Sequence, residues 1–491
     1  MWPQVWMVIL GVILMWSSIG PALRSFIFPK ICHDTVAFFH PFTDDGGGGE
    51  RVLWCAIRTL QELIPRAKFV IYTGDSATAD ALARRARERF GIRILRPVDV
   101  IRLKRRHLLL DSHWPRFTLL GQAYGAVMVT WEAMRLLVPH LFIDTGGYAF
   151  GYPVVRAAGA LTTCYVHYPY VSTDMLARVR DRQVQYNNQS QVASSAWRSF
   201  LKVWYYRAIA LAYWFAGRYA QMVMVNSSWT YAHIVSLWRC KAVTRIVYPP
   251  CQTTALEDFP LARPESNLLI SVAQFRPEKQ QLLQLEAFSL ARRCVIAGFT
   301  GSGVEVLENV NSEAVLRAKL VFVGGCRNEA DRERMSALVT KAAQLGLSDC
   351  VQFMPGLEYP KLVELLGTAV AGLHSMLDEH FGISVVEYMA AGAIAIAHAS
   401  GGPKADIVVD LPGKGEDDKH TPTGFLAQTK EEYAKAIIKV LSLSEPDREM
   451  IRRAARIQAK KFSNEQFEHS LSNAMSVFVE EMNRRCARQR W

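Results

Sequence analysis

The chain has 491 residues, half of them hydrophobic and 11% aromatic, so a mostly disordered protein is excluded and two or three domains with cores of their own are expected. The formal net charge is +12, but Lys and Arg are dispersed instead of gathered with aromatic residues on one module, as a nucleic-acid-binding protein would have them. Anionic lipid surfaces or diphosphate-bearing ligands explain the positive excess equally well.

The nine cysteines are scattered, odd in number and without a C-x-x-C pair. This pattern indicates reduced, mostly buried thiols and argues against a disulfide framework or a zinc site. No cluster of metal-binding carboxylates stands out. Asp44-Asp45 lies in a glycine loop, where turn chemistry explains the pair.

The N-terminal segment from residue 2 to residue 20 contains no charged residue and is just long enough to span a bilayer. We therefore predict a transmembrane anchor at residues 1–22. A cleaved signal peptide is the alternative, but the basic region that usually opens one is missing. Because the first positive charges, Arg24 and Lys30, follow the segment, the bulk of the chain is expected on the cytosolic side.

Strands and helices alternate from Thr35 onward. A strand at 36–42 runs into a glycine loop, and a helix is predicted at 52–63. The glycines Gly47, Gly48 and Gly49 would let the backbone approach a ligand, and the following helix N-terminus favours an anionic one. A flexible turn is the alternative interpretation.

The next elements are predicted as a strand at 69–73, a basic helix at 80–90 stopped by Gly91, a strand at 92–95, a helix at 117–137 and strands at 141–144 and 161–167. His167 stands at the carboxyl end of its strand, where parallel sheets bind ligands. Taken alone, such a histidine is more often a packing residue.

Residues 197–219 are dense in aromatics, and four basic residues interrupt the apolar run too often for a bilayer span. The pattern fits a helix at the membrane interface, with aromatics in the headgroup layer and basic side chains reaching to water. A core helix of the first domain is the alternative, and it is nearly as well supported.

A strand at 222–225 precedes Asn226-Ser227-Ser228-Trp229-Thr230, and residues 245–251 close the first series of elements. We predict an N-terminal lobe at 30–255, a linker at 256–267, a second α/β lobe at 268–445, and C-terminal helices at 446–491 that cross back to the first lobe. Two sequential α/β lobes with a cleft between them are the expected architecture.

The second lobe carries three motifs that follow predicted strands. The first is Ala273-Gln274-Phe275-Arg276-Pro277-Glu278-Lys279. The central one runs from Asp378 to Gly392, with Glu379 and Glu387 separated by seven residues and a helix that starts at Phe381-Gly382 and stops at Gly392. The third is Ser400-Gly401-Gly402-Pro403-Lys404. The helix N-terminus above the carboxyl edge of the sheet is where an anionic phosphate would bind.

The central motif resembles the signature of retaining glycosyltransferases of family 4. The resemblance implies the GT-B fold, with two Rossmann-like doubly wound lobes facing a cleft, and it assigns Glu387 to the nucleotide ribose and Glu379 to the donor sugar. The alternative is that Glu379 caps the helix and Glu387 is a solvated residue. In the diphosphate motif Lys279 matches the family directly. The family's Arg is replaced by Gln274, so Arg276 is expected to substitute for it.

Further motifs are similar to those of the α-1,2-mannosyltransferase family of the dolichol pathway, over roughly residues 35–450. They are Phe39-His40-Pro41 before the glycine loop, Tyr165-Val166-His167-Tyr168-Pro169, Asn226-Ser227-Ser228-Trp229-Thr230, Ala273–Lys279, Cys326-Arg327-Asn328-Glu329 and Ser400–Lys404. The resemblance implies GDP-mannose as donor, a dolichol-diphosphate-linked oligosaccharide as acceptor, and the cytosolic face of the endoplasmic reticulum membrane as location. It gives His167 an acceptor-side or donor-sugar role.

Lys279, Arg276 and the helix N-terminus at Phe381 and Gly382 would stabilise the leaving diphosphate, so no metal or other cofactor is expected. Gly401 and Gly402 could approach the donor, and a plain loop is the alternative. An α-1,3- or α-1,6-mannosyltransferase of the same pathway would share these features, and a catalytically silent binding subunit is the rival from another class. Two glycosylation sequons, at Asn188 and Asn226, would report the location of the domain by their modification.

Overall fold

The computed structural model describes residues 24–43, 47–171, 196–262, 266–305, 307–412 and 420–488, apart from the side chains of 196–203 and 488. Its contacts divide the chain into two compact units. Unit 1 comprises Met1–Asn226, Thr230–Val247 and Glu468–Trp491, and unit 2 comprises Ser227–Trp229 and Tyr248–Phe467. The predicted membrane anchor at 1–22 lies outside the described residues.

The core of unit 1 is a seven-stranded parallel sheet in the order β3-β2-β1-β4-β5-β6-β7. At its centre Phe39 of β1 lies opposite Tyr72 of β2 and Asp144 of β4, so these strands end at one level. Every residue of β4 is buried, as expected for a parallel strand that is covered on both faces. The strands are β1 Ile31–Phe39, β2 Lys68–Thr73, β3 Asp99–Arg102, β4 Val138–Asp144, β5 Leu161–Val166, β6 Met222–Val225 and β7 Thr244–Ile246.

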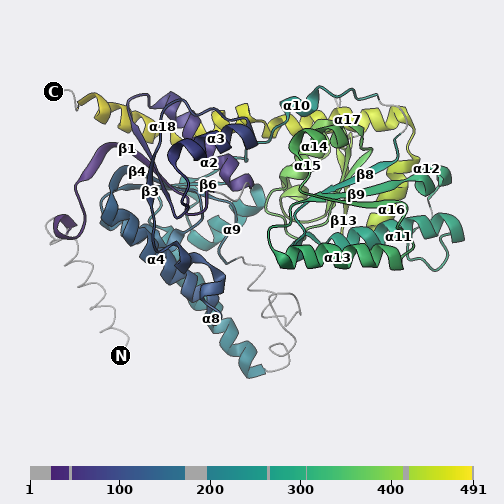
Figure 1. The fold of residues 1–491 in the computed structure, drawn as a ribbon, viewed down its shortest axis with the longest axis horizontal. Coiled ribbons are helices and arrows are strands. Elements are labelled where there is room, and N and C mark those ends of the chain that lie inside the picture. The colour runs from purple at the N-terminus through teal and green to yellow at the C-terminus, as the bar shows by residue number, and fades with distance from the viewer. Residues whose placement is uncertain are drawn as a thin grey trace. The chain divides into compact units, whose positions relative to one another are not determined.

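Helices cover both faces of this sheet (Figure 1). Successive residues of β1 point to opposite faces, and Ala37 and Phe39 belong to the core formed with α4, α5, α8 and α9. The other face carries α2 and α3, and Asn483 of α18 donates a hydrogen bond to the carbonyl of Leu63 at the end of α2. The helices are α2 Gly48–Leu63, α3 Ala79–Phe90, α4 Thr118–Leu136, α5 Tyr152–Ala157, α8 Ala196–Gly217, α9 Ser228–Trp238 and α18 Asn464–Arg488.

The predicted strand at 92–95 is wrong, because the third strand of the sheet is Asp99–Arg102. The backbone N–H groups of Leu95 and Arg96 are bonded to the side chain of Gln61 instead of to a neighbouring strand. The Arg96 guanidinium in turn donates to the carbonyls of Gln61 and Ile64 at the end of α2. These polar side chains give the segment an alternative to sheet pairing.

Unit 2 contains a six-stranded parallel sheet in the order β10-β9-β8-β11-β12-β13. The order reverses between β8 and β11, since the chain leaves β8 toward β9 on one side and later returns to β11 on the other. A crevice at the carboxyl ends of such strands is where doubly wound sheets bind ligands. The strands are β8 Leu268–Val272, β9 Lys319–Gly324, β10 Val351–Pro355, β11 Ala371–His374, β12 Ile394–His398 and β13 Gly424–Ala427.

Two helical layers sandwich this second sheet (Figure 1). One hydrophobic cluster joins the sheet to α11, α12, α13 and α16, and another joins it to α14, α15 and α17. The helices are α10 Thr254–Glu257, α11 Gln281–Ala297, α12 Ser312–Arg317, α13 Glu329–Gln344, α14 Tyr359–Thr368, α15 Ile383–Ala391, α16 Lys430–Ser442 and α17 Glu445–Ala459, with a π-helical turn at Pro403–Ile407.

All nine cysteines are described, and each is a free thiol that is buried or half-buried, as the sequence predicted. The aromatic-rich segment forms the helix α8, whose bounds agree with the predicted 197–219 to within two residues. Within the described part of the chain, none of the helices combines the length and the apolar character that a bilayer crossing needs.

Candidate active site

Three adjacent strands of unit 2 end at the same edge of the sheet, at and beside the reversal of strand order. The turn after β8 carries Lys279, the turn after β11 carries Glu379, and the turn after β12 carries Gly401 and Gly402. The three motifs that were singled out in the sequence of this lobe are thus brought to one place. This edge is the part of a doubly wound sheet that binds ligands.

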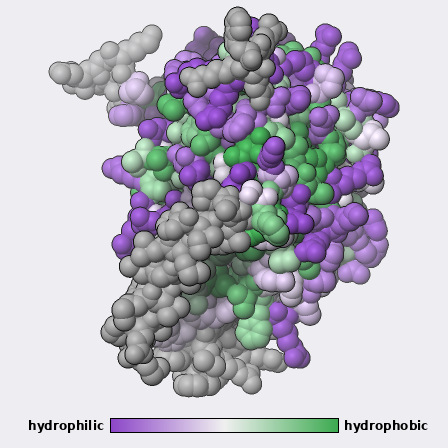
Figure 2. Space-filling view, turned by 90° about the vertical axis from the view of Figure 1, so that its left-hand side faces the viewer, coloured by the Kyte–Doolittle hydropathy of each residue, from purple (hydrophilic) through white to green (hydrophobic). Residues whose placement is uncertain are grey.

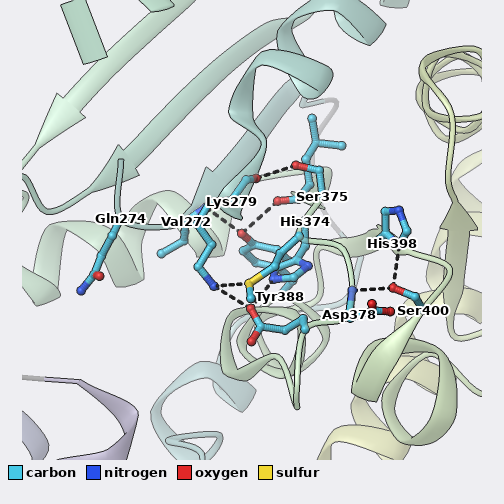
Figure 3. Close-up of polar contacts among 12 residues, drawn as sticks. Val272, Gln274, Lys279, His374, Ser375, Asp378, Tyr388, His398 and Ser400 are labelled. Atoms are coloured by element: carbon cyan, nitrogen blue, oxygen red, sulfur yellow. Dashed lines mark hydrogen bonds and ion pairs between the residues drawn. The ribbon is translucent and has the colours of Figure 1, made fainter. Parts of the chain in front are cut away.

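An ion pair lies at the centre of this site (Figure 3). The Lys279 ammonium is 2.6 Å from Oε2 of Glu379, and it also lies 3.1 Å from the sulfur of Met376. Nε2 of His374 is 3.2 Å from the same carboxylate oxygen. The side chains of Lys279 and Glu379 are 23% and 15% exposed, so the pair is shielded from water but remains within reach of a ligand.

The short turn that presents Lys279 is fastened to the β11 turn by a chain of hydrogen bonds. Lys279 ends the 3₁₀ turn Pro277–Lys279, and its carbonyl accepts a 2.8 Å bond from the Ser375 hydroxyl. The Ser375 hydroxyl in turn accepts a 2.7 Å bond from the side-chain amide of Gln284 on α11. Figure 3 shows Ser375 directed toward the Lys279 backbone. These bonds fix the backbone of Lys279, so the position of its ammonium group does not depend on the flexible side chain alone.

The charge state of Glu379 follows from its partners. Burial would raise the pKa of Glu379, but the Lys279 charge and the hydrogen bond and charge of His374 outweigh it and hold the pKa well below its usual range. Glu379 is therefore a carboxylate throughout the neutral pH range. A fixed negative charge here can offset positive charge that develops on a bound sugar.

His374 was missed as a site residue in the sequence, where it was counted only as the end of a buried strand. Its side chain is 4% exposed and it is the last residue of β11. Its carbonyl accepts a 2.7 Å bond from the Tyr433 hydroxyl, which fixes the backbone below the ring. A polar residue at the carboxyl end of a parallel strand was the signal that pointed to His167, and the same signal applies here.

The start of α15 excludes the alternative that Glu379 caps the helix. The N-cap is Gly382, with φ of +116°, and no side chain caps the first turn. Phe381, 3% exposed, packs its ring against Tyr248 and Phe462 inside unit 2. Only the backbone of Phe381 and Gly382 is thus available to a ligand, together with the N–H groups of the helix start.

Gly401 and Gly402 have a structural reason to be glycine. Gly401 has φ of +60°, and a Cβ on it would lie 2.2 Å from the carbonyl oxygen of Glu379. A Cβ on Gly402 would lie 2.6 Å from Cα of Phe381, and its N–H donates a 2.7 Å bond to the Glu379 carbonyl. The Ser400 hydroxyl accepts a 2.8 Å bond from the Asp378 N–H. The β12 turn therefore interlocks with the β11 turn, which shapes the backbone around Glu379.

The remaining predicted residues of this lobe lie in different surroundings. Glu387 is half-buried on α15. Arg276 lines a hollow of about 690 Å³ together with Arg334 and Lys341 of α13, and this lining includes neither Lys279 nor Glu379. The predicted substitution of Arg276 for the family's arginine remains a prediction.

Unit 1 brings its own predicted residues together. Gly47 is the N-cap of α2, and Gly48 and Gly49 form its first turn, so the helix starts four residues before the predicted Val52. A Cβ on Gly49 would lie 3.5 Å from Nε2 of His167, which places the glycine turn beside that ring. The two features chosen separately in the sequence thus meet at the ends of β1 and β5.

Two buried groups support this second cluster. Nδ1 of His40 lies 2.9 Å from the Thr145 hydroxyl, and burial together with the nearby His167 lowers the pKa of His40 to about 3. The carboxylate of Asp144 accepts bonds of 2.6 to 3.1 Å from the backbone N–H groups that follow it, and a 2.8 Å bond from the Tyr152 hydroxyl. Burial raises the pKa of Asp144 to about 6, although these donors act in the opposite direction.

The sequon at Asn226 is buried. The side chain is 5% exposed, its amide donates a 2.7 Å bond to the His167 carbonyl, and its oxygen accepts a 2.6 Å bond from Thr230. A glycan at Asn226 would break these hydrogen bonds and is incompatible with the folded arrangement. The sequon at Asn188 lies outside the described residues. Over the described ranges, no group of three or more His, Cys, Asp or Glu side chains is arranged to hold a metal ion.

Comparison with known proteins identifies the family of the chain. Residues 33–238 match the family model described as ALG11 mannosyltransferase N-terminus, and residues 253–458 match that of glycosyl transferases group 1. A human protein named GDP-Man:Man(3)GlcNAc(2)-PP-Dol alpha-1,2-mannosyltransferase is 43% identical over 449 residues, which cover 90% of this chain and 87% of the human one. The chain belongs to this mannosyltransferase family. The resemblance drawn from the sequence motifs is thereby confirmed.

Other members and solved structures agree with the assignment. The family member of the same name from Dictyostelium discoideum is 39% identical and aligns with 88% of this chain and 82% of its own length. The crystal structure of Anabaena HepE in complex with UDP and glucose has a TM-score of 0.57 at 14% identity, covering 91% of this chain and all of that one. At this identity the likeness concerns the fold alone. The two parallel-sheet α/β domains are those of GT-B glycosyltransferases, as predicted.

Proposed function

We propose that this mannosyltransferase transfers mannose from GDP-mannose in α-1,2 linkage to Man(3)GlcNAc(2)-PP-dolichol, with retention of anomeric configuration, and so adds the fourth and fifth mannoses. The observation that carries the proposal is the 43% identity to the human enzyme of that name over 90% of the chain. The Lys279–Glu379 pair at the reversal point of the unit 2 sheet supports it, because it joins a cation for a diphosphate to a carboxylate for a sugar.

The donor diphosphate would bind between Lys279 and the first turn of α15. As the bond between the mannose C1 and the phosphate oxygen breaks, negative charge grows on the diphosphate and positive charge grows on the sugar ring. Lys279 stabilises the first charge, and the Glu379 carboxylate offsets the second. The 2-hydroxyl of the acceptor mannose attacks C1 from the same face, and its proton passes to the departing phosphate oxygen.

This front-face route is preferred over a double displacement. A double displacement needs two carboxyl groups about 5 Å apart across the bond that is cleaved. The motif resemblance assigns Glu379 to the donor sugar and Glu387 to the ribose, so it leaves no second carboxylate for the opposite side of that bond. Trapping of a mannosyl-enzyme adduct would contradict the route.

The proposal extends to the surroundings of the enzyme. Residues 1–22 would anchor it in the endoplasmic reticulum membrane, with both lobes on the cytosolic face, where other mannosyltransferases of the pathway would be its neighbours. Because Lys279 and the start of α15 supply positive charge at the diphosphate, transfer is expected to need no added metal. Transfer rates that are unchanged by EDTA would agree with this expectation.

The decisive experiment is transfer from GDP-mannose to a synthetic trimannosyl-chitobiose lipid diphosphate, followed by linkage analysis of the product. The intact chain is compared with Glu379→Ala and with Glu358→Ala. Glu358 is a matched control, since it is an exposed carboxylate of the same lobe that lies 4.0 Å from Lys361. We expect an α-1,2-extended product from the intact chain and from Glu358→Ala, and a large loss of transfer for Glu379→Ala.

Other outcomes identify the rival functions. An α-1,3- or α-1,6-linked product would assign the chain to a different mannosyl-transfer step. Binding of GDP-mannose without turnover, on every lipid-linked acceptor supplied, would indicate a silent binding subunit. Transfer that depends on another sugar nucleotide would keep the fold and overturn the donor.

A further inference from the structure

Two side chains of unit 2 meet at a single oxygen of Glu379. The Lys279 ammonium and Nε2 of His374 lie 2.6 and 3.2 Å from Oε2 of Glu379 (Figure 3), and among the described residues no hydrogen bond ends on the other carboxylate oxygen. Because a carboxylate can only accept hydrogen bonds, Nε2 of His374 must carry a proton and donate it. Glu379 is thus held twice at Oε2, while Oε1 keeps its capacity to accept a bond from a ligand.

The two donors differ in how firmly the protein fixes them. His374 is the last residue of β11, where it lies opposite Ala397 of β12, and its carbonyl accepts the bond from the Tyr433 hydroxyl. Its imidazole therefore comes directly from the interior of the sheet. The Lys279 ammonium stands at the end of a flexible chain of four methylene groups. An anionic ligand can therefore draw the ammonium away without moving the imidazole.

The imidazole of His374 makes no second hydrogen bond. Its Nδ1 is buried and has no hydrogen-bond partner within the part of the chain that the structure describes. A buried nitrogen without a partner costs free energy, and an apolar side chain of similar size would avoid that cost. A residue that only filled the core would gain nothing from the polar ring. The bond from Nε2 to Glu379 is the contact that accounts for a histidine here.

Binding of a diphosphate changes the balance at Oε2. The proposed donor site places the diphosphate at Lys279, so the ammonium has to direct hydrogen bonds to phosphate oxygens that now compete with Glu379. Glu379 then becomes a shielded carboxylate that has lost part of its cation, and desolvation makes such a charge costly. Of the two described donors, His374 is the one that remains in place.

We propose that His374 is a positioning residue that keeps hold of Glu379 while Lys279 turns to the donor diphosphate. This inference rests on the proposed function, because it requires that Lys279 binds the diphosphate and that Glu379 faces the sugar. His374 keeps Oε2 in place, so that Oε1 stays directed at the mannose after the ammonium has moved. The hydrogen bond of His374 is accordingly worth more in the GDP complex than in the free chain.

The test is a double-mutant cycle on GDP affinity, measured by titration calorimetry. His374→Asn shortens the side chain so that its amide cannot reach Glu379, whereas the amide of His374→Gln lies about where Nε2 lies and is the matched control. We expect His374→Asn to raise the Kd for GDP about tenfold, and His374→Gln to change it by less than about threefold. In the Glu379→Gln background, where there is no charge to hold, His374→Asn should leave the Kd unchanged.

The cycle separates positioning from a general structural role. A histidine that only supported the fold would weaken GDP binding equally in both backgrounds, and that result would overturn the proposal. His374→Leu removes the buried Nδ1 as well, so it should fold and should raise the Kd as His374→Asn does. An unchanged Kd for His374→Leu would contradict the proposal. If the intact chain binds no GDP, the proposed function fails too, whereas GDP binding without the coupling overturns only the role of His374.

Mannosyl transfer gives a second readout. His374→Leu should lower kcat about 10- to 100-fold, and His374→Gln should restore most of it. Both assays use the full chain in non-ionic detergent, because hydrophobic residues gather on one surface of unit 1 between hydrophilic margins (Figure 2), and such a patch promotes aggregation. A kcat for His374→Gln as low as that for His374→Leu would show that a donor at this position does not suffice, and the proposal would be wrong.

Discussion

Replacing Glu379 by Gln should make the enzyme bind GDP more tightly while it transfers mannose more slowly. The Lys279 ammonium lies 2.6 Å from the Glu379 carboxylate, so a diphosphate must compete with that carboxylate for the same cation. For a pair that is shielded but not fully buried, the net attraction is ~1–2 kcal/mol. The glutamine side chain of the variant would carry no charge and would not compete with the diphosphate for Lys279. The Kd for GDP should therefore fall about 5- to 30-fold. Titration calorimetry with GDP on the intact chain and the variant measures the change.

Two matched variants separate this effect from a general change in the lobe. Glu387→Gln should weaken GDP binding if that carboxylate holds the ribose, and Glu358→Gln, an exposed carboxylate beside Lys361, should leave binding unchanged. If Glu379→Gln binds GDP as weakly as the intact chain, or more weakly, the ion pair does not compete with the diphosphate. Lys279 would then not be the diphosphate ligand.

Three further predictions test the scaffold of the two sites. Gly401→Ala should reduce mannosyl transfer at least tenfold, because its Cβ would lie 2.2 Å from the Glu379 carbonyl oxygen at a φ of +60° and would displace the turn of Glu379. Gly325→Ala is the control, since it has open space around it and should not change the rate in the same transfer assay. Asp144→Asn puts an amide where the carboxylate accepts bonds from three N–H groups and a hydroxyl, and it should cost ~1–3 kcal/mol, measured as a lower unfolding temperature. His40 has its pKa lowered to about 3 from 6.5, so its contribution to stability is complete above pH 6.5 and is lost as pH falls toward 3. Urea unfolding at pH 7 and pH 5 should show that the intact chain loses ~2 kcal/mol more over this range than His40→Asn does, and the comparison removes the contributions of other titrating groups such as Asp144.

The repeat of strands and helices was readable from the sequence because parallel strands in both lobes are buried on both faces and appear as short apolar runs. Lys279 and Glu379 were also identified, because each lies in a turn after such a run and within a motif that resembles the glycosyltransferase family's. What the sequence did not give was their mutual contact. A contact between residues a hundred positions apart depends on strand order, and strand order is a property of the whole sheet.

The errors have equally local causes. The segment 92–95 is apolar enough for a strand, but Gln61 and Arg96 satisfy its backbone and the end of α2 with side-chain hydrogen bonds. The approach of Gly401 and Gly402 to the donor stays a prediction, and the structure adds a separate reason for glycine, because the nearest atoms to a Cβ at either position belong to the backbone of the neighbouring turn. Side-chain partners of this kind carry no periodic signal, so pattern alone could not predict them.

The interlocked turns after β11 and β12 limit how this lobe can be rebuilt. Because the backbone around Glu379 rests directly on Gly401 and Gly402, neither turn can be exchanged for that of a relative unless the other comes with it. A chimaera in which only the β11 turn is replaced, in order to change the sugar preference, would pack the new turn against a β12 turn that does not fit it. Transplanting both turns as one piece is the smallest exchange that keeps the carboxylate in register with Lys279.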